Sequence, residues 1–375
     1  MIQRLVLAIG SVIWLAAIST VSAASAPADL VVGQVAPFTG PQGVSGLSIS
    51  AGVKLYFDSV NARGGVRGHR LKLVTMDDEQ KPAATVKLTR ELIAAEAPVS
   101  MICTVATGNL EALATDGVLK QSETPMVGAV SGAASVIANP KMFVIKASYH
   151  DEVDRLFKQI ASFGQTRVAV LYQEDNFGQD VLAGAAASAK KYGIELIARA
   201  GYPRNSIAVD KAVAELSKAD PQVILVGGVT SAAIEFVKQY RAAKGTATLY
   251  GLSFVDSDAM LNKLGPDLVR GYAFSVVLPL QQQSQRSVVR EYMQLRAASH
   301  DPNLSARSIE GFIAAKTLVK VLDGIPNPTP QTVSEALAHA RFDLGDYPVD
   351  FTQRGQPGSS YVDFAMFGSN GRIVQ

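Results

Sequence analysis

Short apolar runs alternate along the chain with segments in which apolar residues recur every three to four positions. Helical spacing is clear at Ile49, Val53 and Tyr56, and again at Val209, Val213 and Leu216. A strand, a helix and another strand, repeated over this length, predict parallel sheets with helices on both faces, an α/β fold. The runs that predict strands are residues 30–35, 71–76, 99–105, 167–172, 194–198, 223–226 and 248–252.

The alternation of strand and helix breaks at two places. An apolar run ends at Lys146, and a new series of strand-helix units begins after Tyr149. A second break lies at residues 272–279, and residues 361–367 later alternate like a strand. Both breaks are read as crossovers between two lobes. The helices expected between the second break and the tail are near residues 284–298, 305–322 and 332–340.

These breaks divide the chain into a predicted leader and two lobes. We expect residues 1–23 to be a signal peptide. Lobe 1 is predicted to hold residues 24–146 and 278–340. Lobe 2 is predicted to hold residues 147–277 and 341–375.

The N-terminus has the order of a secretory signal. Arg4 precedes an apolar stretch at residues 5–18, and the small-residue sequence Val21-Ser22-Ala23 follows it. Cleavage is predicted after Ala23, with Ala26 as a second site. A membrane anchor is the alternative, but the apolar stretch is short for one. We therefore expect an exported, soluble mature protein without stable membrane insertion.

Charge and cysteine content exclude several classes of partner. The 375 residues carry a formal net charge of only +2, and no run of lysines and arginines is present to follow phosphates. Nucleic acid is therefore not expected as a partner. The one cysteine, Cys103, cannot form an internal disulfide and is predicted to be a buried apolar residue.

No catalytic, metal or cofactor motif is evident, so an enzyme is not expected. The four histidines share no metal spacing, and a G-x-G-x-x-G nucleotide fingerprint is missing. A Rossmann-type oxidoreductase, the enzyme alternative, would need such a nucleotide. Asp77 and Asp78 resemble paired carboxylates, but adjacent residues at a strand end point to opposite sides. A loop leading to a helix at Pro82 is the preferred interpretation.

Polar groups at the carboxyl ends of predicted strands mark a candidate ligand cleft. Thr104, Ala106 and Thr107 follow a strand and open a helix, whose N-terminus suits a carboxylate. The alternative is that a threonine only caps the helix. The neighbouring loop, Val130, Ser131 and Gly132, is expected to lie alongside.

The second lobe is expected to face the same cleft. Val229 lies after one strand end, and Ser253 and Phe254 lie after another. Tight turns into helices, and core packing for Phe254, are the alternatives. Asp256 is predicted to cap the next helix.

Four segments form a recognisable set: residues 60–71 (VNARGGVRGHRL), 38–41 (FTGP), 125–132 (PMVGAVSG) and 172–178 (YQEDNFG). Together they resemble the leucine/isoleucine/valine-binding protein family, the type I periplasmic solute-binding proteins of ABC importers. The resemblance spans nearly the whole chain after the leader.

The resemblance implies a type I periplasmic-binding fold: two Rossmann-like lobes joined by three crossovers, closing on a solute that is delivered to a membrane permease. It further implies that Thr104 binds the solute's carboxylate, and it supports Tyr149 as an aromatic contact. Relatives that bind free amino acids carry a carboxylate near Ser253 for the ammonium group, and often a hydroxyl residue at Gly132.

We therefore expect a periplasmic receptor that captures a small carboxylate-bearing solute and uses no cofactor. The departures at Gly132 and Ser253 leave branched-chain or other amino acids, aromatic or aliphatic acids and small amides open. A monomer is expected. The alternative in another class is a periplasmic sensor that engages a signalling partner.

Overall fold

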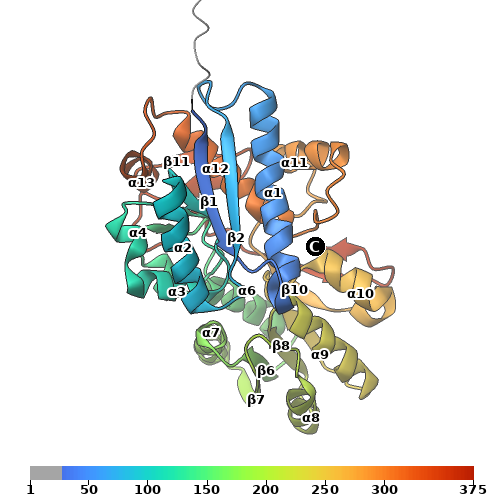
Figure 1. Cartoon of the computed structure of the whole chain (residues 1–375). Coiled ribbons are helices and arrows are strands. Elements are labelled where there is room, and N and C mark those ends of the chain that lie inside the picture. The colour runs from blue at the N-terminus through green and yellow to red at the C-terminus, as the bar shows by residue number, and fades with distance from the viewer. Residues whose placement is uncertain (1–27) are drawn as a thin grey trace, which may run out of the picture.

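The computed structural model describes residues 28–375 and shows two α/β lobes, one above the other in Figure 1. The predicted signal peptide at residues 1–23 lies outside the described residues. Each lobe is built on its own sheet, and helices cover the sheet faces. The predicted α/β class and two-lobed arrangement are therefore confirmed.

The sheet of the first lobe is parallel throughout and has the strand order β2-β1-β3-β4-β5. In its register, Leu30 of β1 pairs with Leu71 of β2, and Val32 pairs with Ser100 of β3. The strands are β1 (Leu30–Ala36), β2 (Leu71–Asp77), β3 (Ser100–Ile102), β4 (Met126–Val127) and β5 (Met142–Phe143).

The sheet of the second lobe is mixed, with the order β14-β13-β10-β9-β8-β6-β7. Strands β6 to β10 are parallel to one another and repeat the strand order of the first lobe. Strands β13 and β14 add antiparallel at the β10 edge, which the expectation of parallel sheets did not include. The strands are β6 (Arg167–Gln173), β7 (Glu195–Tyr202), β8 (Val223–Gly227), β9 (Thr248–Gly251), β10 (Ala273–Val276), β13 (Asp363–Phe367) and β14 (Ile373–Val374).

Helix α12, late in the sequence, returns to the first lobe and lies beside α1 (Figure 1). The ring of Tyr56 on α1 meets Phe312 on α12 edge to face, with centroids 5.0 Å apart. The helices used below are α1 (Gly43–Ala62), α2 (Pro82–Glu96), α3 (Thr107–Asp116), α6 (Tyr149–Ser162), α7 (Asn176–Tyr192), α8 (Asp210–Lys218), α9 (Thr230–Ala242), α10 (Ser257–Val269), α11 (Ser287–Ala298), α12 (Ser308–Leu322) and α13 (Pro330–Ala338).

A small hairpin precedes the final strands and contacts the first lobe. It consists of β11 (Arg341–Asp343) and β12 (Pro348–Asp350). Just beyond it, the Phe351 ring lies 5.3 Å from that of Phe143 on β5, and the Gly358 N–H donates to the Val144 carbonyl at 2.7 Å. The lobe boundaries stay a prediction, and these contacts favour a last crossover after residue 358 over one at residue 341.

Candidate functional site

The loop between β3 and α3 has an unusual backbone. Cys103 and Ala106 have φ values of +53° and +85°, a region that residues with a side chain rarely adopt. Between them, Thr104 is fully buried, and its Oγ1 has no hydrogen-bond partner. Such strain persists only where the surrounding structure holds it, and it concentrates at functional sites. Cys103 is buried, as predicted.

The N-terminus of α3 has no side-chain cap. Its N-cap residue is Ala106, so neither Thr104 nor Thr107 caps the helix. Thr107 instead shares a 2.9 Å hydrogen bond with the hydroxyl of Ser131. The structure therefore contradicts the capping alternative and leaves helix N–H groups beside two hydroxyl side chains.

The loop after β4 lies alongside this helix start, as expected. The Val130 N–H donates to the Thr104 carbonyl at 2.9 Å, and the Ala133 N–H donates to Ser131 Oγ at 3.1 Å. Gly132 accepts a 2.9 Å bond from the Tyr149 N–H, and a Cβ at Gly132 would lie 2.8 Å from that nitrogen. The missing side chain at Gly132 thus allows Tyr149 to approach.

Tyr149 begins α6 and is fully buried. Ser148 and Asp151 fix this helix start through a reciprocal capping box. Burial raises the pKa of the Tyr149 phenol, although the nearby Ser131 hydroxyl acts to lower it. The phenol oxygen has no hydrogen-bond partner, so it is a further free polar group beside Ser131.

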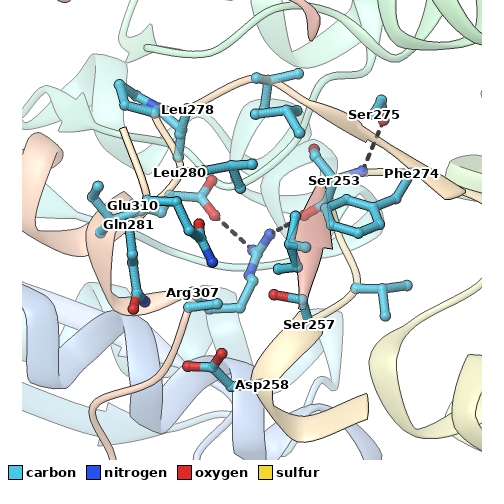
Figure 2. Close-up of a pocket in the computed structure, with 18 residues that line it drawn as sticks. Ser253, Ser257, Asp258, Phe274, Ser275, Leu278, Leu280, Gln281, Arg307 and Glu310 are labelled. Carbon is cyan, nitrogen blue, oxygen red and sulfur yellow. Dashed lines mark hydrogen bonds and ion pairs between the residues drawn. The ribbon is translucent and has the colours of Figure 1, made fainter. Parts of the chain in front are cut away.

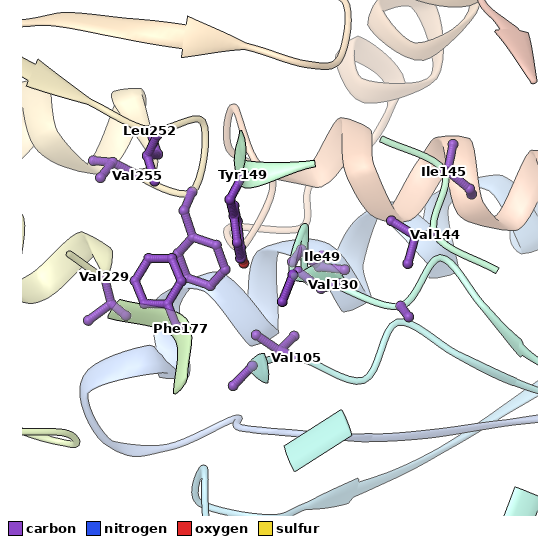
Figure 3. Close-up of a cluster of buried hydrophobic side chains, with 14 of the residues drawn as sticks. Ile49, Val105, Val130, Val144, Ile145, Tyr149, Phe177, Val229, Leu252 and Val255 are labelled. Carbon is purple, nitrogen blue, oxygen red and sulfur yellow. The ribbon is translucent and has the colours of Figure 1, made fainter. Parts of the chain in front are cut away.

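A cluster of three aromatic rings connects Tyr149 with the second lobe. The Phe177 ring on α7 lies 5.1 Å from Tyr149 and 5.4 Å from Phe254. Figure 3 shows Tyr149 beside Phe177, with Val105 and Val130 of the first lobe on one side and Val229 beyond the rings. Phe177 received no role from the sequence, although it lies in the segment YQEDNFG. The strand-end rule applied to β6 would have found it.

Direct contacts hold the lobes together in this structure. Arg204, which follows β7, donates to the Gln80 carbonyl at 2.9 Å and to Asn109 Oδ1 at 2.6 Å, both in the first lobe. Ser231 on α9 donates to the Pro41 carbonyl at 2.8 Å. The structure therefore shows the two lobes closed on each other.

Ser253 lies at a junction of buried charges. Its N–H donates to Glu152 Oε2 at 2.9 Å, and its carbonyl accepts from Arg307 Nη1 at 2.9 Å. Arg307 also lies over the Phe254 ring, 5.1 Å from its centroid. The sequence has Ser253 where relatives that bind free amino acids carry a carboxylate, with Asp256 and Asp258 a few residues later. In the structure Glu152, which lies 101 positions earlier in the chain, is beside Ser253, and no local sequence pattern indicates that contact.

The Asp pair and Asp256 have the structural roles that were predicted. Asp78 accepts from Thr85 Oγ1 at 2.7 Å, and Asp77 accepts from the Phe38 N–H at 2.9 Å. Asp256 caps α10 by accepting from the Ala259 N–H at 3.0 Å. Within residues 28–375, no group of three or more histidine, cysteine or acidic residues could hold a metal ion.

The structure places Thr104, Ala106, Thr107, Val130, Ser131, Gly132 and Tyr149 together around one loop pair. Phe254, next to Ser253, meets this group through the Phe177 ring, and Val229, the N-cap residue of α9, lies nearby. Their role as solute contacts stays a prediction.

Glu152 gives a prediction about pH and stability. Burial raises the pKa of its carboxyl, and nearby Lys146 and the Ser275 hydroxyl offset this only in part. A carboxyl whose folded-state pKa is raised loses stability as pH rises from its unfolded pKa through its folded pKa. We expect Glu152→Gln to remove this loss of stability, which is about 1.4 kcal/mol for each pKa unit by which the folded-state pKa exceeds the unfolded one.

The measurement is urea unfolding of Glu152→Gln and wild type at several pH values. The difference in free energy of unfolding should move in favour of the variant as pH rises. The exposed Glu195→Gln on β7 is the control and should show a flat difference. A flat difference for Glu152→Gln as well would contradict the assigned pKa direction.

Known proteins resemble this chain over nearly its full length. Residues 29–372 match the family described as periplasmic binding protein. The chain is 23% identical over 353 residues to "Leu/Ile/Val-binding protein homolog 7" of Brucella suis biovar 1 (strain 1330), covering 89% of this chain and 88% of that protein. None of the helices within residues 28–375 is long and apolar enough to cross a membrane.

Solved structures show the same architecture. A substrate-binding periplasmic protein from Ralstonia solanacearum is 40% identical with a TM-score of 0.90, covering 92% of this chain and all 100% of that chain. A solute binding protein of an ABC transporter from R. palustris, in complex with benzoate, has a TM-score of 0.81 at 20% identity. The match covers 92% of this chain and 95% of that chain.

These matches confirm the predicted resemblance and the type I two-lobed fold. The matched family and the superposed structures are substrate-binding proteins, which also confirms the prediction that this chain is not an enzyme. With the family matched over residues 29–372, the chain belongs to the periplasmic binding protein family.

Proposed function

We propose that this protein is the periplasmic receptor of an ABC importer and captures a small carboxylate-bearing solute by closing its two lobes. The solute's carboxylate binds at the start of α3, through Thr104, Thr107 and Ser131. Tyr149, Phe177 and Phe254 form the apolar walls. The closed receptor then delivers the solute to a membrane permease.

The observation that carries the proposal is the uncapped N-terminus of α3 beside a buried hydroxyl without a partner. A buried polar group with no hydrogen bond costs about 1–3 kcal/mol. Thr104 Oγ1 is such a group. A bound carboxylate would accept its hydrogen bond together with those of the helix N–H groups.

The relatives support a carboxylate and leave the rest of the solute open. The Brucella protein is named for leucine, isoleucine and valine, and the R. palustris protein holds benzoate. These solutes share a carboxylate, whereas only the amino acids carry an ammonium group. Glu152 supplies a buried carboxyl beside Ser253, so free amino acids stay within the proposed class.

Closure follows from contacts that both lobes make with the same solute. The first-lobe loops bind the carboxylate in the open form, and closure adds Ser253 and Phe254. A solute favours the closed state only by its greater affinity for that state. Arg204 would stabilise closure further through Gln80 and Asn109.

Thr104→Val tests the proposed carboxylate site, because valine keeps the side-chain volume and removes the hydroxyl. A thermal-shift screen of amino acids, aromatic acids, short-chain acids and amides first identifies the strongest binder. Loss of one charge-assisted hydrogen bond costs about 1.5–3 kcal/mol. We therefore expect this binder's Kd, measured by calorimetry, to rise about 10- to 150-fold.

Thr89→Val is the matched control. Thr89, on α2, is another fully buried threonine whose hydroxyl has no partner. It should leave the Kd unchanged. Unchanged affinity in Thr104→Val would show that the carboxylate binds elsewhere.

A further inference from the structure

A pocket lies at the junction of the two lobes and shares only Ser253 with the predicted solute contacts (Figure 2). Its walls come from the β9–α10 loop, from β10 and the crossover after it, and from the start of α12. The cavity between these walls has a volume of about 70 Å³. We call it the hinge pocket.

The apolar part of the hinge pocket is formed by Phe274, Leu278, Leu280 and Ile309. This lining would bury a short aliphatic body. Leu278 and Leu280 belong to the crossover between β10 and α11, so their positions depend on the angle between the lobes. A molecule bound here would therefore contact residues whose positions depend on closure of the lobes.

Buried polar groups without partners lie in the same walls. Arg307 has only 6% of its side chain exposed, and its Nε has no hydrogen-bond partner. Gln281 Nε2 and Ser253 Oγ also have none. Arg307 Nε and Gln281 Nε2 are donors, and the serine hydroxyl both donates and accepts, so a carbonyl oxygen is the head group that this set would bind.

The charges around the pocket are already balanced. Glu310 lies 2.8 Å from Lys146 Nζ and 2.6 Å from Arg307 Nη2, and Lys146 also acts on Glu152. Figure 2 shows Arg307 between Glu310 and Ser253. Two cations thus face two carboxyls, and Asp258, also in the lining, pairs with Arg296 at 3.5 Å. A charged guest would add an unpaired charge at a buried site, which is costly.

We propose that the hinge pocket binds a second small molecule, neutral and amide-headed with a short aliphatic body, separately from the solute in the cleft. The amide carbonyl accepts from Arg307 Nε and Gln281 Nε2, and its N–H donates to Ser253 Oγ. Because the pocket's walls come from both sides of the crossover, occupancy favours the closed lobes. By linkage, the solute in the cleft and the molecule in the hinge pocket raise each other's affinity by one common factor.

Isovaleramide and isovalerate test the proposal, because they share a shape and differ in charge. We expect isovaleramide to raise the melting temperature of wild type along a saturable curve. The same curve should appear in Thr104→Val, whose cleft is altered. It should disappear in Leu278→Trp, which adds bulk to the pocket wall.

Gln281→Leu removes one donor and keeps the experiment decisive if Leu278→Trp fails to fold. The half-saturating concentration of isovaleramide should rise about 2- to 12-fold, from the loss of one neutral hydrogen bond. The exposed Gln285→Leu is its control and should match wild type.

Several results would overturn the hinge site. They are no saturable shift in wild type, a shift that persists in both pocket variants, and a shift lost only in Thr104→Val, which would place the amide in the cleft. An isovalerate shift that depends on Leu278 and Gln281 would overturn the assignment to a neutral guest. The carboxylate proposal fails separately, through unchanged solute affinity in Thr104→Val.

Discussion

Replacing Glu310 by glutamine is expected to lower the free energy of unfolding by about 3–5 kcal/mol at neutral pH. Glu310 is 7% exposed and is the direct ion-pair partner of both Lys146 and Arg307, at 2.8 and 2.6 Å. Glutamine keeps the shape but leaves two buried cations without that carboxylate. Breaking one side of a buried ion pair costs far more than removing an exposed one.

The pH dependence of this loss has a definite sign. Burial acts to raise the pKa of Glu310, but Arg307 and Lys146 outweigh it and hold the pKa below its ordinary value. A carboxyl with a lowered folded-state pKa contributes stability above its unfolded pKa, and this is lost as pH falls through the folded-state value. Wild type should therefore approach Glu310→Gln in acid.

Urea unfolding from neutral to acidic pH measures both effects. Glu91→Gln on α2 is the control, because Glu91 forms only an exposed pair with Lys87 at 3.8 Å. Its free energy of unfolding should stay within about 0.5 kcal/mol of wild type. A similarly small loss in Glu310→Gln would mean that water already solvates Lys146 and Arg307.

The sequence predicted the longer strands because each contains several apolar or β-branched residues in a short run. The run at residues 223–226 became β8 (Val223–Gly227), all five residues of which are buried. Strands β4 and β5 have only two residues each, too few for a periodic pattern. Residues 361–367 were correctly predicted to form a strand, but the antiparallel pairing of this strand with β10 depends on partners about 90 positions away.

The candidate site was predictable where it follows a strand end. Thr104, Ser131 and Ser253 lie after β3, β4 and β9, and the rule for parallel sheets indicates such positions. Glu152 and Arg307 lie in or beside helices, and only the folded chain brings them to Ser253. Nothing local in the sequence distinguishes them from ordinary charged residues.

Gly311→Ala is expected to lower the free energy of unfolding by about 3 kcal/mol, because α1 and α12 touch through their backbones. A Cβ at Gly311 would lie 1.9 Å from the Ile49 carbonyl oxygen, and one at Gly52 would lie 1.8 Å from that of Ser308. Backbone atoms in a helix cannot move away by changing rotamer, as a flexible side chain can, so the two helices must separate. Overpacking a core typically costs about 1–3 kcal/mol, and this contact belongs at the upper end.

Gly324→Ala, just beyond the end of α12, is the matched control for the same substitution. Its Cβ would meet nothing closer than 3.5 Å, the Val321 carbonyl oxygen, so its stability should stay near that of wild type. Urea unfolding of both variants makes the comparison, and equal stability would mean that the helices lie further apart. Since Arg307 precedes the first turn of α12, separation would also draw it from Ser253. Gly311→Ala should therefore weaken solute binding as well, whereas Gly324→Ala should not.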